Sequence, residues 1–92
     1  MTAFALSPVV PNPTMGGIEF EYALPRETSG RLSVVDLQGR EMAVLADGAL
    51  AAGRHRATWN SRTDRGPASA GLYFVRFQAA GKTLVQRFAI VR

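Results

Sequence analysis

The sequence predicts an all-β fold, a small antiparallel sandwich of about seven strands. Turn signals recur about every ten residues, which is the spacing typical of such sandwiches. Residues 18–24 place apolar side chains at every second position, as expected for a strand with one buried face. No stretch combines helical periodicity with helix caps. Together these observations favour strands over helices throughout.

The chain has the size and composition of one globular domain. Its 92 residues are 47% hydrophobic and 20% charged, which is sufficient for one modest core. It contains no cysteine, so a disulfide framework and a thiolate metal site are excluded. No apolar run approaches the ~20 residues of a membrane span, and the start lacks the basic region of a signal peptide. We expect residues 1–92 to form one domain, with residues 1–5 disordered or a linker remnant.

The first strands are predicted at residues 5–10 and 18–24. Pro11-Asn12-Pro13 ends the first strand because a proline nitrogen cannot donate a ladder hydrogen bond. In the second strand the even positions face the core, while Glu19 and Glu21 face solvent. Pro25 ends this strand.

The middle of the chain predicts strands at residues 31–37, 41–45 and 54–60. Leu32 and Val34 are the core candidates of the first, and a tight hairpin over residues 36–40 leads to the second. Asp47-Gly48 predicts a turn, and residues 50–53 a loop with Leu50 turned inward. An alanine-rich helix over residues 43–52 is the alternative, which the interrupting glycines disfavour.

The last third predicts a polar loop and a closing hairpin. The loop spans residues 61–70, with Gly66-Pro67 at its tip. A strand over residues 71–77 then meets a short turn at Ala80-Gly81, and the last strand runs from residue 82 to residue 92. Alternation turns Phe88 and Ile90 inward and leaves the face bearing Arg87 in solvent.

The charge is distributed unevenly. Residues 1–46 hold three arginines and five acids, a net −2, whereas residues 47–92 hold eight basic residues and two acids, a net +6. A basic half suggests nucleic-acid binding. The bases are scattered singly rather than in a dense run, so a solvated or protein-docking face is favoured.

The sequence contains almost no residues arranged for catalysis. His55 is the single histidine and is expected to be a partly buried strand residue with a hydrogen-bonded ring. Glu19 and Glu21 are expected to be solvated charges rather than an acid–base pair. Asp64 has too few oxygen-bearing neighbours for a calcium site, so a local turn is expected there. We expect no enzyme activity and no cofactor.

The aromatic residues leave one binding function open. Seven of them fall on strand positions, where core packing is the commoner role. An exposed stripe would instead suit a small carbohydrate-binding module. Phe74 lies opposite Tyr73 and Phe77, so the exposure of Phe74 and of Trp59 tests this alternative.

The ordered motifs along the chain resemble a known family. They are Pro11-Asn12-Pro13, Tyr22-Ala23-Leu24-Pro25, Val34-Val35-Asp36-Leu37-Gln38-Gly39-Arg40, Gly53-Arg54-His55 leading to Trp59-Asn60, Ala70-Gly71-Leu72-Tyr73-Phe74-Val75-Arg76-Phe77 and Gln86-Arg87-Phe88-Ala89-Ile90-Val91-Arg92. Over residues 6–92 they resemble the C-terminal sorting domain (type A) of type IX secretion substrates. They are equally similar to the immunoglobulin-like domain of the flagellar hook-capping protein.

The resemblance implies a seven-stranded immunoglobulin-like β-sandwich without enzyme activity. It implies export of a bacterial cargo protein through the periplasm to the cell surface or medium. The implied partners are the secretion machinery, a sortase-like peptidase and an upstream cargo domain in the same chain, with no nucleic acid and no integral membrane segment. A hook-cap-like assembly module is the alternative, and it would show lost assembly without an export defect.

The resemblance also assigns roles to individual residues. Structural roles are expected for the entry motif Pro11, Asn12 and Pro13, for the hairpin residues Asp36, Gly39 and Arg40, and for Gly71 and Tyr73 of the penultimate strand. Recognition by a partner is expected of Lys82, Arg87, Val91 and Arg92 in the last strand. Gln86 or Arg87 stands where the family usually has lysine.

Overall fold

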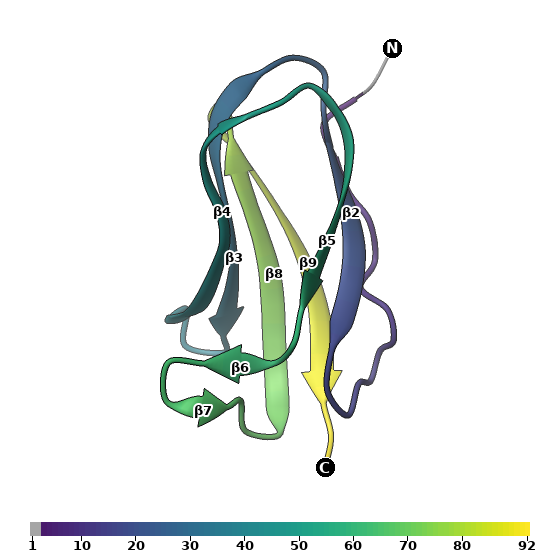
Figure 1. The fold of residues 1–92 in the computed structure, drawn as a ribbon, viewed down its shortest axis with the longest axis vertical. Coiled ribbons are helices and arrows are strands. Elements are labelled where there is room, and N and C mark those ends of the chain that lie inside the picture. Colours follow the sequence, from purple (N-terminus) through teal and green to yellow (C-terminus); the bar gives the residue numbers. More distant parts are fainter. Residues whose placement is uncertain (1–2) are drawn as a thin grey trace.

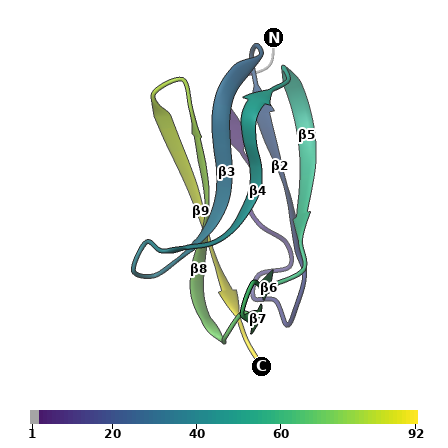
Figure 2. The ribbon, with the colours of Figure 1, turned by 60° about the vertical axis from the view of Figure 1, so that its left-hand side comes forward.

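The computed structural model describes residues 3–92, which form nine strands and no helix. The strands are β1 (Ala5–Leu6), β2 (Ile18–Leu24), β3 (Thr28–Asp36), β4 (Glu41–Leu50), β5 (Gly53–Trp59), β6 (Arg62–Thr63), β7 (Gly66–Pro67), β8 (Gly71–Ala79) and β9 (Lys82–Ile90). One sheet has the order β1-β2-β5 and the other β4-β3-β8-β9, and all strand pairs in them are antiparallel (Figure 1). Figure 2 shows the two sheets facing each other as separate layers.

The predicted all-β, antiparallel class is confirmed, whereas the number of strands differs. The two additional strands, β6 and β7, are two residues each and pair within the segment predicted as a loop. Gly66-Pro67 therefore lies in a strand and not at the tip. The immunoglobulin-like topology stays a prediction. No helix in the described part of the chain has the length and apolarity to cross a membrane.

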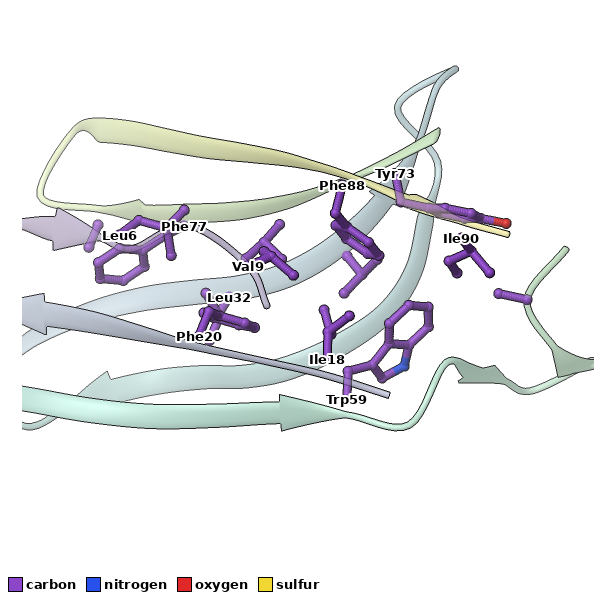
Figure 3. Close-up of a cluster of buried hydrophobic side chains, with 14 of the residues drawn as sticks. Leu6, Val9, Ile18, Phe20, Leu32, Trp59, Tyr73, Phe77, Phe88 and Ile90 are labelled. Atoms are coloured by element: carbon purple, nitrogen blue, oxygen red, sulfur yellow. The ribbon is translucent and has the colours of Figure 1, made fainter. Parts of the chain in front are cut away.

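The core lies between the two sheets, on the inward face of each. Leu32 and Val34 of β3 and Val75 and Phe77 of β8 are fully buried at its centre, as predicted for the first two. Figure 3 shows Ile18 and Trp59 from one sheet pointing toward Tyr73, Phe88 and Ile90 of the other. Each large apolar side chain buried in this way stabilises the fold by about 1.5–3 kcal/mol.

The largest correction concerns β4, which is longer than predicted. Asp47 and Gly48 do not form a turn but continue the strand, paired with Arg31 and Gly30 of β3. The register between the two strands shifts twice, between Leu32 and Ser33 and between Val34 and Val35, whereas Gly48, with a φ of 112°, lies in the regular part of the ladder. Bulges of this kind place extra residues in one strand without ending it. The helical alternative over residues 43–52 is wrong for the same reason, while Leu50 faces inward as predicted.

Other strands also begin or end at residues different from those predicted. The first strand stops at Leu6, and Val10 makes only an isolated bridge to Glu19. β3 begins three residues earlier than predicted, at Thr28, and β5 ends at Trp59. The last strand ends at Ile90, so Val91 and Arg92 lie beyond it.

The N-terminal segment is part of the fold from Phe4 onward. Ala5 begins β1, and the ring of Phe4 packs 5.5 Å from that of Phe77. The expectation of a disordered or linker segment is therefore wrong for Phe4 and Ala5. Met1 and Thr2 lie outside the described residues.

Candidate functional site

The hairpin of β8 and β9 separates a core face from a solvent face. Its turn uses Ala80 and Gly81, both with positive φ (52° and 75°), as tight two-residue hairpins require. Phe88 and Ile90 of β9 are buried at 1% exposure each. Thr83, Val85 and Arg87 alternate with them on the other face and are exposed. The predicted division of β9 into an inward and an outward face is thus present.

The four predicted recognition residues do not form one cluster. Lys82 lies at the turn, with its ammonium 5.5 Å from the centre of the Phe4 ring. Arg87 is exposed in the second half of β9, and within residues 3–92 it makes no ion pair. Arg92 lies at the far end, where its guanidinium donates to the carbonyl of Ala68. Lys82 and Arg92 are on the order of 33 Å apart along an extended strand.

The entry segment, residues 11–14, pairs with the end of β9. The Asn12 side chain donates from Nδ2 to the Arg87 carbonyl (3.2 Å) and accepts at Oδ1 from the Ala89 N–H (3.1 Å). The Thr14 N–H donates to the Ala89 carbonyl (2.9 Å), and the Thr14 carbonyl accepts from the Val91 N–H (2.8 Å). Pro11 and Pro13 have no N–H, so the Asn12 amide supplies the donor and acceptor that the neighbouring backbone lacks.

This pairing covers part of the outer edge of β9. The outward backbone groups from the Arg87 carbonyl to the Val91 N–H are occupied by the entry segment. Nearer the turn, from Thr83 to the Arg87 N–H, no backbone segment within residues 3–92 pairs with this edge, although the Gln86 side chain donates to the Leu6 carbonyl of β1 (3.0 Å). We call residues 83–87 the free edge. Sequence reasoning missed Asn12 and Thr14 as partners of β9 because Asn12 and Arg87 are 75 residues apart.

The hairpin motif at residues 36–40 forms a hydrogen-bonded turn between β3 and β4. Asp36 accepts at Oδ1 from the N–H groups of Gln38 and Arg40 and at Oδ2 from the Arg40 Nε, all at 2.9 Å. Gly39 has a φ of 85°, which glycine adopts without a Cβ penalty. The Arg40 N–H, assisted by the Arg40 guanidinium and the Gln38 N–H, holds the pKa of Asp36 below its ordinary value of 3.8.

An Asp36→Asn variant is expected to be less stable at neutral pH than the wild type. Because the pKa of Asp36 is lower in the folded state, its stabilisation is present above the unfolded pKa and is lost as the pH falls through the folded pKa. The variant should therefore lose less stability on acidification. Urea unfolding in neutral and acidic buffer measures both effects, and equal acid losses in the two proteins would contradict this role. Arg31 lowers the pKa of Glu41 as well, so protonation of Glu41 accounts for the stability that the variant still loses on acidification.

Tyr73 lies in the core. Its ring is buried, lies 5.9 Å from that of Phe88, and its hydroxyl donates to the Ser69 carbonyl at 2.7 Å. Gly71 is the exposed first residue of β8. The structural roles expected of the motif residues stay predictions.

The residues considered for catalysis and metal binding are His55, Glu19 and Glu21. His55 is half-buried, stacks on Tyr22 and contacts the Ala51 carbonyl through Nε2 (2.8 Å), as expected. Glu19 and Glu21 face solvent beside the arginines of β5, at 3.6 to 3.9 Å. Among the described residues no group of three His, Cys, Asp or Glu side chains could hold a metal.

The exposed aromatic platform that the carbohydrate-binding alternative requires is not formed by the described residues. Trp59 is only 6% exposed, and its indole N–H donates to the Arg62 carbonyl (3.1 Å). Phe74 is half-buried on the outer face of β8. A shallow cavity of about 630 Å³ lies beside Trp59, lined by Val10, Pro11 and Ile18 among others, with Glu19 as its one titratable group. None of these offers an exposed ring on which a sugar could stack.

Comparison with known proteins assigns the family. The model of the family described as "Secretion system C-terminal sorting domain" matches residues 8–91. No curated protein and no solved structure matches the chain. The match covers nearly the whole sequence, including the entry segment and both strands of the terminal hairpin. The chain therefore belongs to the secretion system C-terminal sorting domain family.

Proposed function

We propose that the secretion machinery reads this domain through the solvent face of its last hairpin, with Arg87 as the central contact. A domain of this family is a C-terminal sorting signal for type IX secretion, and its cargo is exported to the cell surface or medium. Family membership implies a secretion machinery as partner and a cargo in the same polypeptide. Outlying contacts are proposed at Lys82, the first residue of β9, and at Val91 and Arg92, which follow its last residue.

The environment of Arg87 carries the proposal. Its side chain is exposed and has no ion pair within residues 3–92, whereas the arginines of β3, β5 and β8 lie beside carboxylates. Its neighbour Phe88 is buried in the core. A partner could therefore contact Arg87 without disturbing the packing that holds the sandwich together.

Arg87→Glu in the natural polypeptide is expected to lower the amount of cargo at the cell surface by about tenfold or more. A glutamate would face the acidic group of the partner that Arg87 contacts, and two like charges at a contact cost several kcal/mol. Arg87→Lys keeps the charge and should retain secretion. The matched control is Arg65→Glu, an equal charge change at an exposed arginine between β6 and β7 that also lacks an ion pair in the described part of the chain. Equal surface amounts for Arg87→Glu and wild type would refute the proposal.

The route and the processing step are also proposed from the family resemblance. Cargo that is not recognised accumulates in the periplasm, and a sortase-like peptidase removes the domain from cargo that reaches the surface. Cell fractionation tests the first point. Mass spectrometry tests the second, because processed surface cargo would lack the 9.9 kDa domain. The hook-cap alternative stays a prediction with a different phenotype, lost assembly without an export defect.

A further inference from the structure

We infer that the free edge of β9, residues 83–87, accepts an extended acidic segment of the secretion machinery as an added antiparallel or parallel strand. This inference rests on the proposed function, and it adds how the hairpin is bound and which chemistry its partner has. The partner backbone would continue the four-stranded sheet beyond β9, in the manner of β-strand addition.

Strand geometry places unpaired backbone groups along the free edge. The first pair of the hairpin, Ala79 and Lys82, flanks a two-residue turn and is hydrogen-bonded. In an antiparallel ladder hydrogen-bonded pairs alternate with pairs that are not, so Leu84, Gln86 and Phe88 also bond to β8. Residues 83, 85 and 87 therefore point their N–H and C=O groups away from β8. Within residues 3–92, no hydrogen bond partner is found for these groups of Thr83 and Val85.

The chain itself supplies hydrogen-bond partners to the other half of this edge. At the same alternate positions further along β9, the entry segment already bonds to the Arg87 carbonyl, to both backbone groups of Ala89 and to the Val91 N–H. Thr14 makes a parallel bridge to Ile90 there. This internal pairing ends at Asn12, which leaves a five-residue acceptor of about 17 Å between Asn12 and the turn.

Charge distinguishes this edge from the others. β4, the opposite edge of the same sheet, is interrupted by two register shifts, which weaken strand addition. The edge of β5 is regular, but its Arg54 and Arg56 lie beside Glu21 and Glu19. Beside the free edge, Arg87 and Lys82 make no ion pair among the described residues. An acidic side chain next to Arg87 and an apolar one next to Val85, which is 50% exposed, would complement this surface.

Val85→Pro in the natural polypeptide tests the inference. Proline removes the outward N–H of residue 85 and leaves the bonds to β8 intact, as edge positions tolerate. We expect surface cargo to fall by at least about tenfold, while the melting temperature of the 92-residue chain changes by no more than about 8 °C. Val85→Ala keeps the N–H and should retain secretion. Thr58→Pro makes the same change on the regular edge of β5 and should also retain it.

The possible outcomes separate this inference from the proposed function. Normal secretion of Val85→Pro together with loss in Arg87→Glu overturns strand addition and leaves the proposed function intact. Normal secretion of both variants overturns both proposals. If the melting temperature of Val85→Pro changes by more than the stated range, Thr83→Pro is measured instead. It removes another outward N–H of the free edge, nearer the turn, and normal secretion of this variant would overturn strand addition. A wild-type dimer in solution that Val85→Pro dissociates would show that the free edge binds a second copy, which also overturns the inference.

Discussion

Replacing Phe88 by alanine is expected to lower the free energy of unfolding by about 3–5 kcal/mol. The Phe88 side chain is 1% exposed and fills the space between the two sheets, with ring centres 5.9 Å from Tyr73 and 6.3 Å from Trp59. Truncation removes this contact area and leaves a cavity that the surrounding rings fill only partly. Domains of this size are stable by about 5–15 kcal/mol, so the variant would lose a large fraction of its stability. Urea unfolding measures the change.

The neighbouring residue provides the matched control. Arg87 occupies the preceding position of the same strand and also lies opposite a residue of β8, but its side chain is exposed. Arg87→Ala should change the free energy of unfolding by no more than about 0.5 kcal/mol. If the two alanine variants were equally stable, the assignment of opposite faces to core and solvent would be wrong.

Gly30→Ala is expected to lower the free energy of unfolding by about 1–3 kcal/mol because the position has no room for a methyl group. Gly30 lies in β3, paired with Gly48 on one side and Ala79 on the other. A Cβ there would lie 2.9 Å from the Gln78 carbonyl oxygen, 3.0 Å from the Ala79 Cβ and 3.0 Å from the Leu50 Cδ1. The nearest of these atoms belongs to backbone, which cannot move away without disturbing the β3–β8 ladder.

Gly16 is the matched glycine. A Cβ at Gly16 would meet no atom within 4 Å, and its φ is not in the left-handed region. Gly16→Ala should therefore leave the free energy of unfolding within about 0.5 kcal/mol of wild type, or raise it slightly by restricting the unfolded chain. Comparable losses in the two variants would show that the cost at Gly30 comes from lost flexibility and not from contact.

Local patterns predicted most of the fold. The alternation in residues 18–24 identified β2, with Ile18 and Phe20 buried, and the residues Asp36 and Gly39 identified a hairpin that the structure contains. In each case the information lies within a few residues, because side-chain alternation and turn chemistry are local properties. The core assignments of Leu32 and Val34 followed from the same alternation.

The errors arose where tertiary pairing overrides local preference. Asp-Gly is a strong turn signal, yet the long β3 partner keeps residues 47 and 48 extended, with Asp47 opposite Arg31 and Gly48 opposite Gly30. The cover of the β9 edge by Asn12 and Thr14 depends on residues far apart in the sequence. A single sequence contains no local signal for such a contact, so the free edge could be delimited only from the structure.

The central claim is that β9 has two separable faces, one that holds the fold and one that is recognised. The most direct test measures Arg87→Glu and Phe88→Ala in parallel, by the free energy of unfolding of the 92-residue chain and by the amount of cargo at the cell surface. We predict that Arg87→Glu lowers surface cargo while its stability stays within about 0.5 kcal/mol of wild type, and that Phe88→Ala lowers both. Normal surface cargo in Arg87→Glu, or a loss of secretion that only accompanies a loss of stability, would contradict the claim.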